Sequence, residues 1–182
     1  MPATLGQSWA MVEIRAVTAD DWRLWRRARL AALAGAPDAY HTRLADWQGP
    51  GDREQRWRER LSIPGALDLI AVRSGEPVGI ASGVPEPEGT AATIISMWVD
   101  HAARGSGVGD RLLGTLENWA LDRGYSTLRL EVFAGNEHAI GLYRRNGFEF
   151  QSRTAESTES YGDPTPDGRV ERIMVKVLLP TG

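Results

Sequence analysis

One glycine-rich segment restricts the possible folds more than any other part of the sequence: Arg104-Gly105-Ser106-Gly107-Val108-Gly109-Asp110. The run 90–99 before it is rich in Ile, Thr and Val, which predicts a strand. After it, apolar residues recur at helical spacing until Gly124. Glycines between a strand and a helix allow a tight turn, and the free N–H groups of the helix start favour an anion. We therefore expect an α/β fold that contains a phosphate-binding loop.

A glycine-rich loop of this kind can also have a purely structural role. Close packing of a strand against a helix requires a similar turn, and the spacing alone does not distinguish the two roles. The loop lacks the Gly-Lys-[Ser/Thr] ending of a Walker-type loop. A dinucleotide-binding fingerprint usually opens its domain, whereas this loop follows the fourth predicted strand. Both of these alternative phosphate loops fit poorly.

The rest of the pattern predicts one domain over 11–180 with a mixed sheet. The expected strands are 13–17, 67–73, 78–84, 90–99, 127–133, 148–153 and 169–179. The expected helices are 18–34, 52–61, 108–124 and 136–145. Thr18 and Asp21 have the spacing of a capping box. Because hairpins alternate with βαβ crossovers, the sheet should contain parallel and antiparallel pairs and be partly covered by helices.

Two motifs in this order resemble the GCN5-related N-acetyltransferase (GNAT) superfamily. Arg104-x-x-Gly107-x-Gly109 is similar to its R/Q-x-x-G-x-G/A motif, and the strand before it ends in Met97-Trp98-Val99. Downstream, the N-x-x-A-x-x-L-Y-x-x-x-G-F segment is matched by Asn136, Ala139, Leu142-Tyr143 and Gly147-Phe148. The resemblance covers roughly 90–150. It implies the GNAT fold, a mixed central sheet of about seven strands flanked by about four helices, and acetyl-CoA-dependent transfer to a primary amine of a small molecule or peptide.

The resemblance also implies which residues bind acetyl-CoA, the expected cosubstrate. The glycine loop would bind the CoA pyrophosphate. Backbone groups at the end of the preceding strand would face the pantetheine arm and the acetyl carbonyl. The expected cofactor-binding residues are Met97, Trp98, Val99, Arg104, Gly105, Ser106, Gly107, Val108, Gly109, Asp110, Asn136 and Tyr143.

Tyr143 is our candidate for the general acid. Transfer from a thioester to an amine requires a neutral amine and a proton for the departing thiolate. Tyr143 falls on the same face of its predicted helix as Asn136, where a phenol can protonate sulfur. A buried tyrosine on an amphipathic helix explains the position without catalysis. The family resemblance favours the catalytic role.

Glu131 is our candidate for the general base. It lies on the polar face of the strand 127–133. Ribosomal-protein N-terminal acetyltransferases resemble this chain in the order Leu130-Glu131-Val132, then Asn136, then Leu142-Tyr143, and this likeness implies the role. Pairing with Arg129 on the same face explains Glu131 equally well. Asp100, a residue of 154–168 or a water chain remain alternatives.

The sequence indicates less about the amine acceptor than about the cosubstrate. Five aromatic residues of the N-terminal third either form core or shape the acceptor site: Trp22, Trp25, Tyr40, Trp47 and Trp57. His41 can line that site or simply pair with Tyr40. The segment that contains Glu156, Glu159, Tyr161 and Asp163 is acidic. Its charge would attract a polyamine, an aminoglycoside-like amine or a peptide N-terminus, although a solvated loop explains the charge equally well.

Composition excludes several other classes. The chain has no cysteine, which removes thiol nucleophiles, thiolate metal sites and disulfides, and it has no apolar run long enough to span a membrane. The three histidines show no metal-ligand spacing, so we expect no metal. A net charge of -3 gives no overall attraction to nucleic acid, and the arginines at 23–29 fit a solvated helix face.

Three expectations about the whole protein remain. We expect a cytoplasmic protein, since the sequence has no cysteine and no apolar run of membrane-spanning length. Lys176 is the only lysine, and arginine use of this kind is typical of GC-rich bacterial genomes. A homodimer is possible by resemblance to the superfamily. The alternative to an enzyme is a catalytically silent CoA-sensing or protein-interaction module with the same fold.

Overall fold

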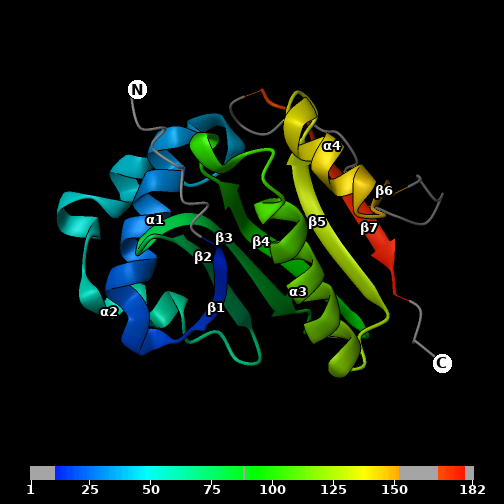
Figure 1. The fold of residues 1–182 in the computed structure, drawn as a ribbon, viewed down its shortest axis with the longest axis horizontal. Coiled ribbons are helices and arrows are strands. Elements are labelled where there is room, and N and C mark those ends of the chain that lie inside the picture. Colours follow the sequence, from blue (N-terminus) through cyan, green and yellow to red (C-terminus); the bar gives the residue numbers. More distant parts are fainter. Residues whose placement is uncertain (1–10, 88, 152–167, 179–182) are drawn as a thin grey trace, which may run out of the picture.

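The centre of the protein is a seven-stranded mixed sheet, seen in a computed structural model that describes residues 11–87, 89–151 and 168–178 (Figure 1). Its strands are β1 (Glu13–Val17), β2 (Leu67–Arg73), β3 (Glu76–Pro85), β4 (Ala91–Val99), β5 (Thr127–Phe133), β6 (Glu149–Phe150) and β7 (Glu171–Val177). They lie in the order β1-β2-β3-β4-β5-β7-β6. Only the β4–β5 pair of this sheet is parallel. The mixed sheet predicted from the sequence is confirmed.

The α-helices of the described residues also agree with the prediction: α1 (Trp22–Gly35), α2 (Glu54–Arg60), α3 (Val108–Asp122) and α4 (Glu137–Arg145). The capping box forms before α1, since the backbone N–H of Thr18 donates to the Asp21 carboxylate at 2.9 Å. It caps a short 3₁₀ turn, Ala19–Asp21, that leads into the helix. None of the described helices is long and apolar enough to cross a bilayer.

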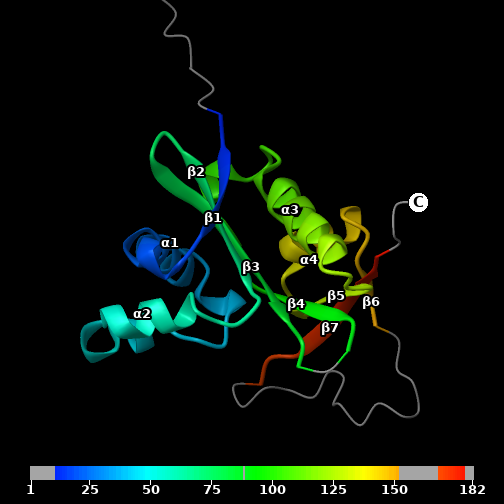
Figure 2. The same cartoon turned by 90° about the horizontal axis from the view of Figure 1, so that it is seen from below.

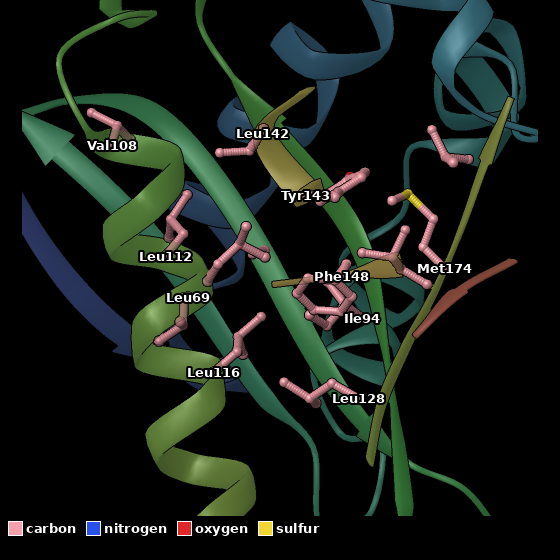
Figure 3. Packing of buried hydrophobic residues seen from close by; sticks show 14 of the residues in the cluster. Leu69, Ile94, Val108, Leu112, Leu116, Leu128, Leu142, Tyr143, Phe148 and Met174 are labelled. Carbon is pink, nitrogen blue, oxygen red and sulfur yellow. The ribbon is translucent and has the colours of Figure 1, made fainter. Parts of the chain in front are cut away.

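Helices cover both faces of the sheet. On one face, α3 and α4 pack over a cluster that includes Leu69, Leu112, Leu116 and Phe148 (Figure 3). On the other face, α1 and α2 pack over a second cluster that includes Ile70 (Figure 2). Consecutive residues of β2 enter opposite clusters because side chains alternate across a strand. Burial on both faces explains why the central strands read as nearly continuous apolar runs.

Some boundaries differ from the prediction. Of the strand expected at 148–153, the described residues form only Glu149–Phe150, since the backbone N–H of Phe148 bonds to the Tyr143 carbonyl at the end of α4. Residues 152 and 153, like 179, lie outside the described part of the chain. The helix expected from Asp52 begins at Glu54, since the Asp52 carboxylate instead accepts hydrogen bonds from Arg26 and from the Trp57 indole.

The pairing of β4 with β5 stops partway along both strands. Their register runs only from Ala91 opposite Thr127 to Ile94 opposite Leu130. Just beyond, β4 carries an irregularity in its register with β3, and Ser96 takes a left-handed φ of 57°. The later part of β4, through Val99, therefore has no β5 partner. A bulge next to an interrupted pair is a common way to open a sheet at a functional site.

Candidate active site

Two cavities meet where β4 and β5 separate. The gap cavity is lined by residues of β4, β5 and α4, among them Met97, Val99 and Asn136. The aromatic cavity, of about 400 Å³, lies toward α1 and the segment 39–47. Five residues line both cavities: Ala39, Tyr40, Met97, Glu131 and Tyr143. The two catalytic candidates chosen from the sequence are therefore brought to one junction by separate elements.

Tyr143 reaches this junction from α4. Its side chain is 6% exposed, and its ring meets the edge of Phe148 with centroids 6.0 Å apart. Among the described residues its hydroxyl has no hydrogen-bond partner. Burial raises the pKa of Tyr143 above its usual range, and the nearby Tyr40 adds to the effect. The phenol therefore keeps its proton at neutral pH and is able to donate it.

Glu131 projects from β5 beside two groups that are distant in sequence. His41 Nε2 lies 2.7 Å from Glu171 Oε1, and these groups and the Glu131 carboxylate have ligand atoms within 4.8 Å of one another. All three line the aromatic cavity. The Arg129 guanidinium, the expected partner of Glu131 on its strand, lies 3.8 Å from Glu86. Spacing in the sequence could not indicate this acid–imidazole–acid group, whose atoms are close enough to hold a metal ion.

Tyr40 forms part of the wall between the cavities. Its hydroxyl donates a hydrogen bond of 2.9 Å to the main-chain carbonyl of Met97, in the part of β4 that does not pair with β5. The guanidinium of Arg29 lies over its ring, 4.4 Å from the centroid. Burial raises the pKa of Tyr40 to about 12, so the phenol remains a donor. The sequence marked Tyr40 only as one of five aromatic residues.

A buried polar cluster holds the bulge of β4 in place. Arg60, near the end of α2, donates to Asp68 Oδ1 at 3.0 Å, to Ser82 Oγ at 2.8 Å and to Ser96 Oγ at 3.2 Å. Asp68 and Ser82 are almost fully buried. Since a left-handed backbone is costly for any residue except glycine, these bonds stabilise the strained conformation of Ser96. Sequence analysis did not identify this cluster, because its members come from three strands and a helix.

The glycine loop has the shape expected of an anion-binding turn. Gly105 and Gly107 have φ of 75° and 80°, and a Cβ at either position would meet no atom within 4 Å. Gly107 caps α3, so the loop opens at the positive end of a 15-residue helix. Gly109 serves packing instead, since a Cβ there would lie 2.9 Å from Leu142. The residues present fit a pyrophosphate held by backbone N–H groups.

The remaining cofactor candidates divide into two groups. Met97, Trp98, Val99, Arg104 and Asn136 line the gap cavity. The side chains in the first turn of α3 are used elsewhere: Val108 is buried in the core, and Asp110 binds Arg145 and Asn146 at 2.8 Å. Ser106 Oγ donates to the Ala103 carbonyl. Val108, Gly109 and Asp110 are thus left with only backbone groups to offer a ligand.

The other candidates from the sequence lie away from the junction or outside the described residues. The Asp100 carboxylate accepts the N–H of Ala102 at 2.8 Å and lines neither cavity. The acidic candidates Glu156, Glu159, Tyr161 and Asp163 belong to 152–167, which lies outside the described residues. Trp25, Trp47 and Trp57 line the aromatic cavity, and Trp25 and Trp57 are also fully buried core residues. Trp25 and Trp57 therefore belong both to the core and to the wall of the aromatic cavity.

Comparison with known proteins agrees with this geometry. The model of the acetyltransferase (GNAT) family matches residues 30–148. An IAA acetyltransferase of Azospirillum brasilense is 37% identical over 90 residues, which are 50% of this chain and 59% of that protein. An L-methionine sulfoximine/L-methionine sulfone acetyltransferase of Pseudomonas aeruginosa is 33% identical over 71% of this chain and 80% of its own length. The chain thus spans less than two thirds of the first relative.

Solved structures show the same fold. The ribosomal-protein-S18-alanine N-acetyltransferase of Escherichia coli superposes with a TM-score of 0.65 at 25% identity, covering 94% of this chain and 97% of that one. The PaiA N-acetyltransferase of Thermoplasma acidophilum, solved with coenzyme A, gives a TM-score of 0.68 at 17% identity, covering 92% and 99%. With the sheet order, the open β4–β5 pair and the glycine loop in agreement, the chain belongs to the acetyltransferase (GNAT) family.

Proposed function

We propose that this protein is an acetyl-CoA-dependent N-acetyltransferase that moves an acetyl group directly to a primary amine. The observation that carries the proposal is the junction, where Tyr143 and Glu131 line both the gap cavity and the aromatic cavity. A direct transfer requires two substrates to meet at one place with an acid and a base. The absence of cysteine removes a thiol-based covalent route.

The gap cavity and the glycine loop would bind acetyl-CoA. Acetyl-CoA supplies the acetyl group as an activated thioester. Gly105 and Gly107 leave open space at the start of α3 for a pyrophosphate, and the part of β4 without a β5 partner includes Met97. The related proteins are named acetyltransferases, and one solved relative contains coenzyme A. These likenesses support the same cosubstrate for this chain.

Tyr143 would act as the general acid. Its raised pKa keeps the phenol protonated, and its position in the walls of both cavities lets the proton reach a thiolate as the C–S bond breaks. Burying the neutral phenol costs less than burying its ionised form, so the protonated donor is favoured there. The proton that Tyr143 loses can be replaced once CoA has left.

Glu131 would accept the proton of the attacking amine. Its carboxylate lies in the wall of both cavities, and the nearby Glu171 adds a second carboxylate on this side of the junction. Negative charge there favours binding of an ammonium, and transfer of one proton to Glu131 yields the neutral nucleophile. The proposal does not require a metal.

The proposed function is tested by following CoA thiol release with a disulfide reagent, an assay kept clean by the absence of cysteine. The acceptors are amino acids, polyamines, aminoglycosides and N-terminal peptides. Release that depends on one acceptor class supports the transferase. If acetyl-CoA binds but no amine is acetylated, the chain acts instead as a CoA-binding module. The domain limits 11–180, a cytoplasmic location and a homodimer stay proposals from the sequence.

A further inference from the structure

One arginine of the aromatic cavity, Arg29, is half-buried and has no acidic partner among the described residues. Arg29 lines the cavity from α1, and its Nη1 is buried without a hydrogen bond. Tyr40 is its close contact: the ring centroid lies 4.4 Å from the guanidinium, and the phenol also interacts with it as a hydrogen-bond partner, but this partner is not a carboxylate. A buried guanidinium ordinarily has a carboxylate or several acceptors, because an uncompensated buried charge is costly.

The second arginine that lines the aromatic cavity, Arg60, does not supply the missing acidic partner of Arg29. Arg60 also lines the cavity, but its guanidinium is paired with Asp68 at 3.0 Å and bound to two serines. Arg29 therefore contributes a net positive charge to its end of the cavity. Burial lowers the pKa of Arg29; Tyr40 partly offsets this effect by raising the pKa, and the charge of Arg60 lowers it.

The other end of the same cavity has the opposite charge. Glu131 and Glu171 line it beside His41, with their ligand atoms within 4.8 Å of one another. Tyr40 joins the two ends, since its ring contacts Arg29 and its hydroxyl binds the Met97 carbonyl at the junction. One side chain therefore contacts both the cation and the strand at the junction.

From this arrangement we infer that the acceptor is an amino acid, an amine with its own carboxylate a few bonds away, and that Arg29 binds that carboxylate. This inference rests on the proposed transferase function and names its substrate class. The carboxylate supplies the missing acceptor for Arg29, while the ammonium faces Glu131 and Glu171. The indoles of Trp25, Trp47 and Trp57 leave apolar walls for the side chain. Polyamines have no carboxylate, and in a peptide the α-carboxyl group of the N-terminal residue is an amide.

The test compares matched acceptors. CoA release is measured with each standard L-amino acid except cysteine, whose thiol would react with the reagent, with the corresponding carboxamides, and with spermidine and a tripeptide. The wild-type protein should acetylate at least one amino acid with a kcat/KM on the order of 10- to 100-fold above that of its amide, the range expected for a charge-assisted hydrogen bond. Arg29→Gln should remove this preference, and Arg29→Lys should restore part of it.

Two controls separate this inference from folding and from the proposed function. Arg23→Gln changes an exposed arginine of the same helix, whose guanidinium lies over Trp22, and should keep the preference. Binding of acetyl-CoA by each variant reports folding without an acceptor. Preference for amides, spermidine or the tripeptide, or an unchanged preference in Arg29→Gln, would overturn the inference and leave the transferase intact. Failure with every amine would overturn both.

Discussion

The hydroxyl of Tyr40 donates a 2.9 Å hydrogen bond to the main-chain carbonyl of Met97, and thereby joins the segment after α1 to the open strand β4. Both residues line both cavities. This bond gives the loop beside the aromatic cavity a fixed position relative to the strand that would bind the acetyl arm. Substrates on the two sides would then be aligned by one contact.

Tyr40→Phe should therefore lower kcat more than it lowers affinity for acetyl-CoA. Loss of the bond leaves the Met97 carbonyl without this donor, and we expect about 0.5–1.5 kcal/mol lower stability. Thermal unfolding and steady-state kinetics measure the two effects. Tyr125→Phe is the matched control. The Tyr125 ring packs on Trp119, with centroids 5.5 Å apart, and neither residue lines either cavity. Equal effects of the two substitutions would contradict the alignment role.

Tyr143→Phe should lower kcat by about 10²- to 10⁴-fold, the usual contribution of a general acid, with little change in the Kd for acetyl-CoA. The ring remains to fill the same space in the core, so the fold is kept. Because burial raises the pKa of Tyr143, its proton is retained through the alkaline range in which an ordinary tyrosine ionises, near pH 10. Single-turnover kinetics check the prediction, and unchanged turnover would remove the acid role.

Glu131→Gln should reduce turnover most at low pH. Below the pKa of the amine the acceptor is an ammonium, so a base has to remove its proton, whereas above that pKa the amine is already neutral. The pH profile of kcat/KM should therefore lose its acidic side while its alkaline plateau changes less. Glu149→Gln, an exposed substitution on β6, is the control. An unaltered profile would point to another base.

Gly107→Val should abolish tight binding of acetyl-CoA. A side chain there projects into the open space where the pyrophosphate is expected, and φ of 80° adds backbone strain of about 1–2 kcal/mol. Gly75→Val imposes the same strain in the β2–β3 turn, at φ of 82° and also in open space. Calorimetric titration compares the two folded variants. Weakening by both to the same degree would show that strain alone explains the loss.

Arg60→Met should destabilise the fold by about 3–5 kcal/mol, because it leaves the buried Asp68 carboxylate without its partner. The strained Ser96 would lose a hydrogen bond as well, so the opening of β4 should be disturbed. Arg58→Met, two positions earlier on α2, removes exposed pairs with Glu54 and Asp20 and a hydrogen bond to the Ala19 carbonyl, and should cost less, about 1–2 kcal/mol. Chemical denaturation measures both. Similar losses would contradict the role of the cluster.

Local sequence patterns determined much of this protein. Alternation and helical spacing located the strands and helices to within a few residues, because those periods depend only on neighbours along the chain. The motif residues Gly107, Asn136 and Tyr143 could be named because a linear spacing carries them. The candidate acid and base lie on adjacent elements, β5 and α4, which follow one another in the chain.

Only the tertiary structure decided how the acceptor side is built. Arg29, His41 and Glu171 come from α1, the segment after it and β7, and no spacing relates them. Ser96 of β4 takes its left-handed conformation with a hydrogen bond from Arg60 of α2. Because this residue is not a glycine, the sequence did not indicate the interruption of β4. Burial and charge at such a site depend on which segments the fold brings together. The sequence therefore indicated the chemistry at the cofactor, and the packing of distant elements determined the cavity for the amine.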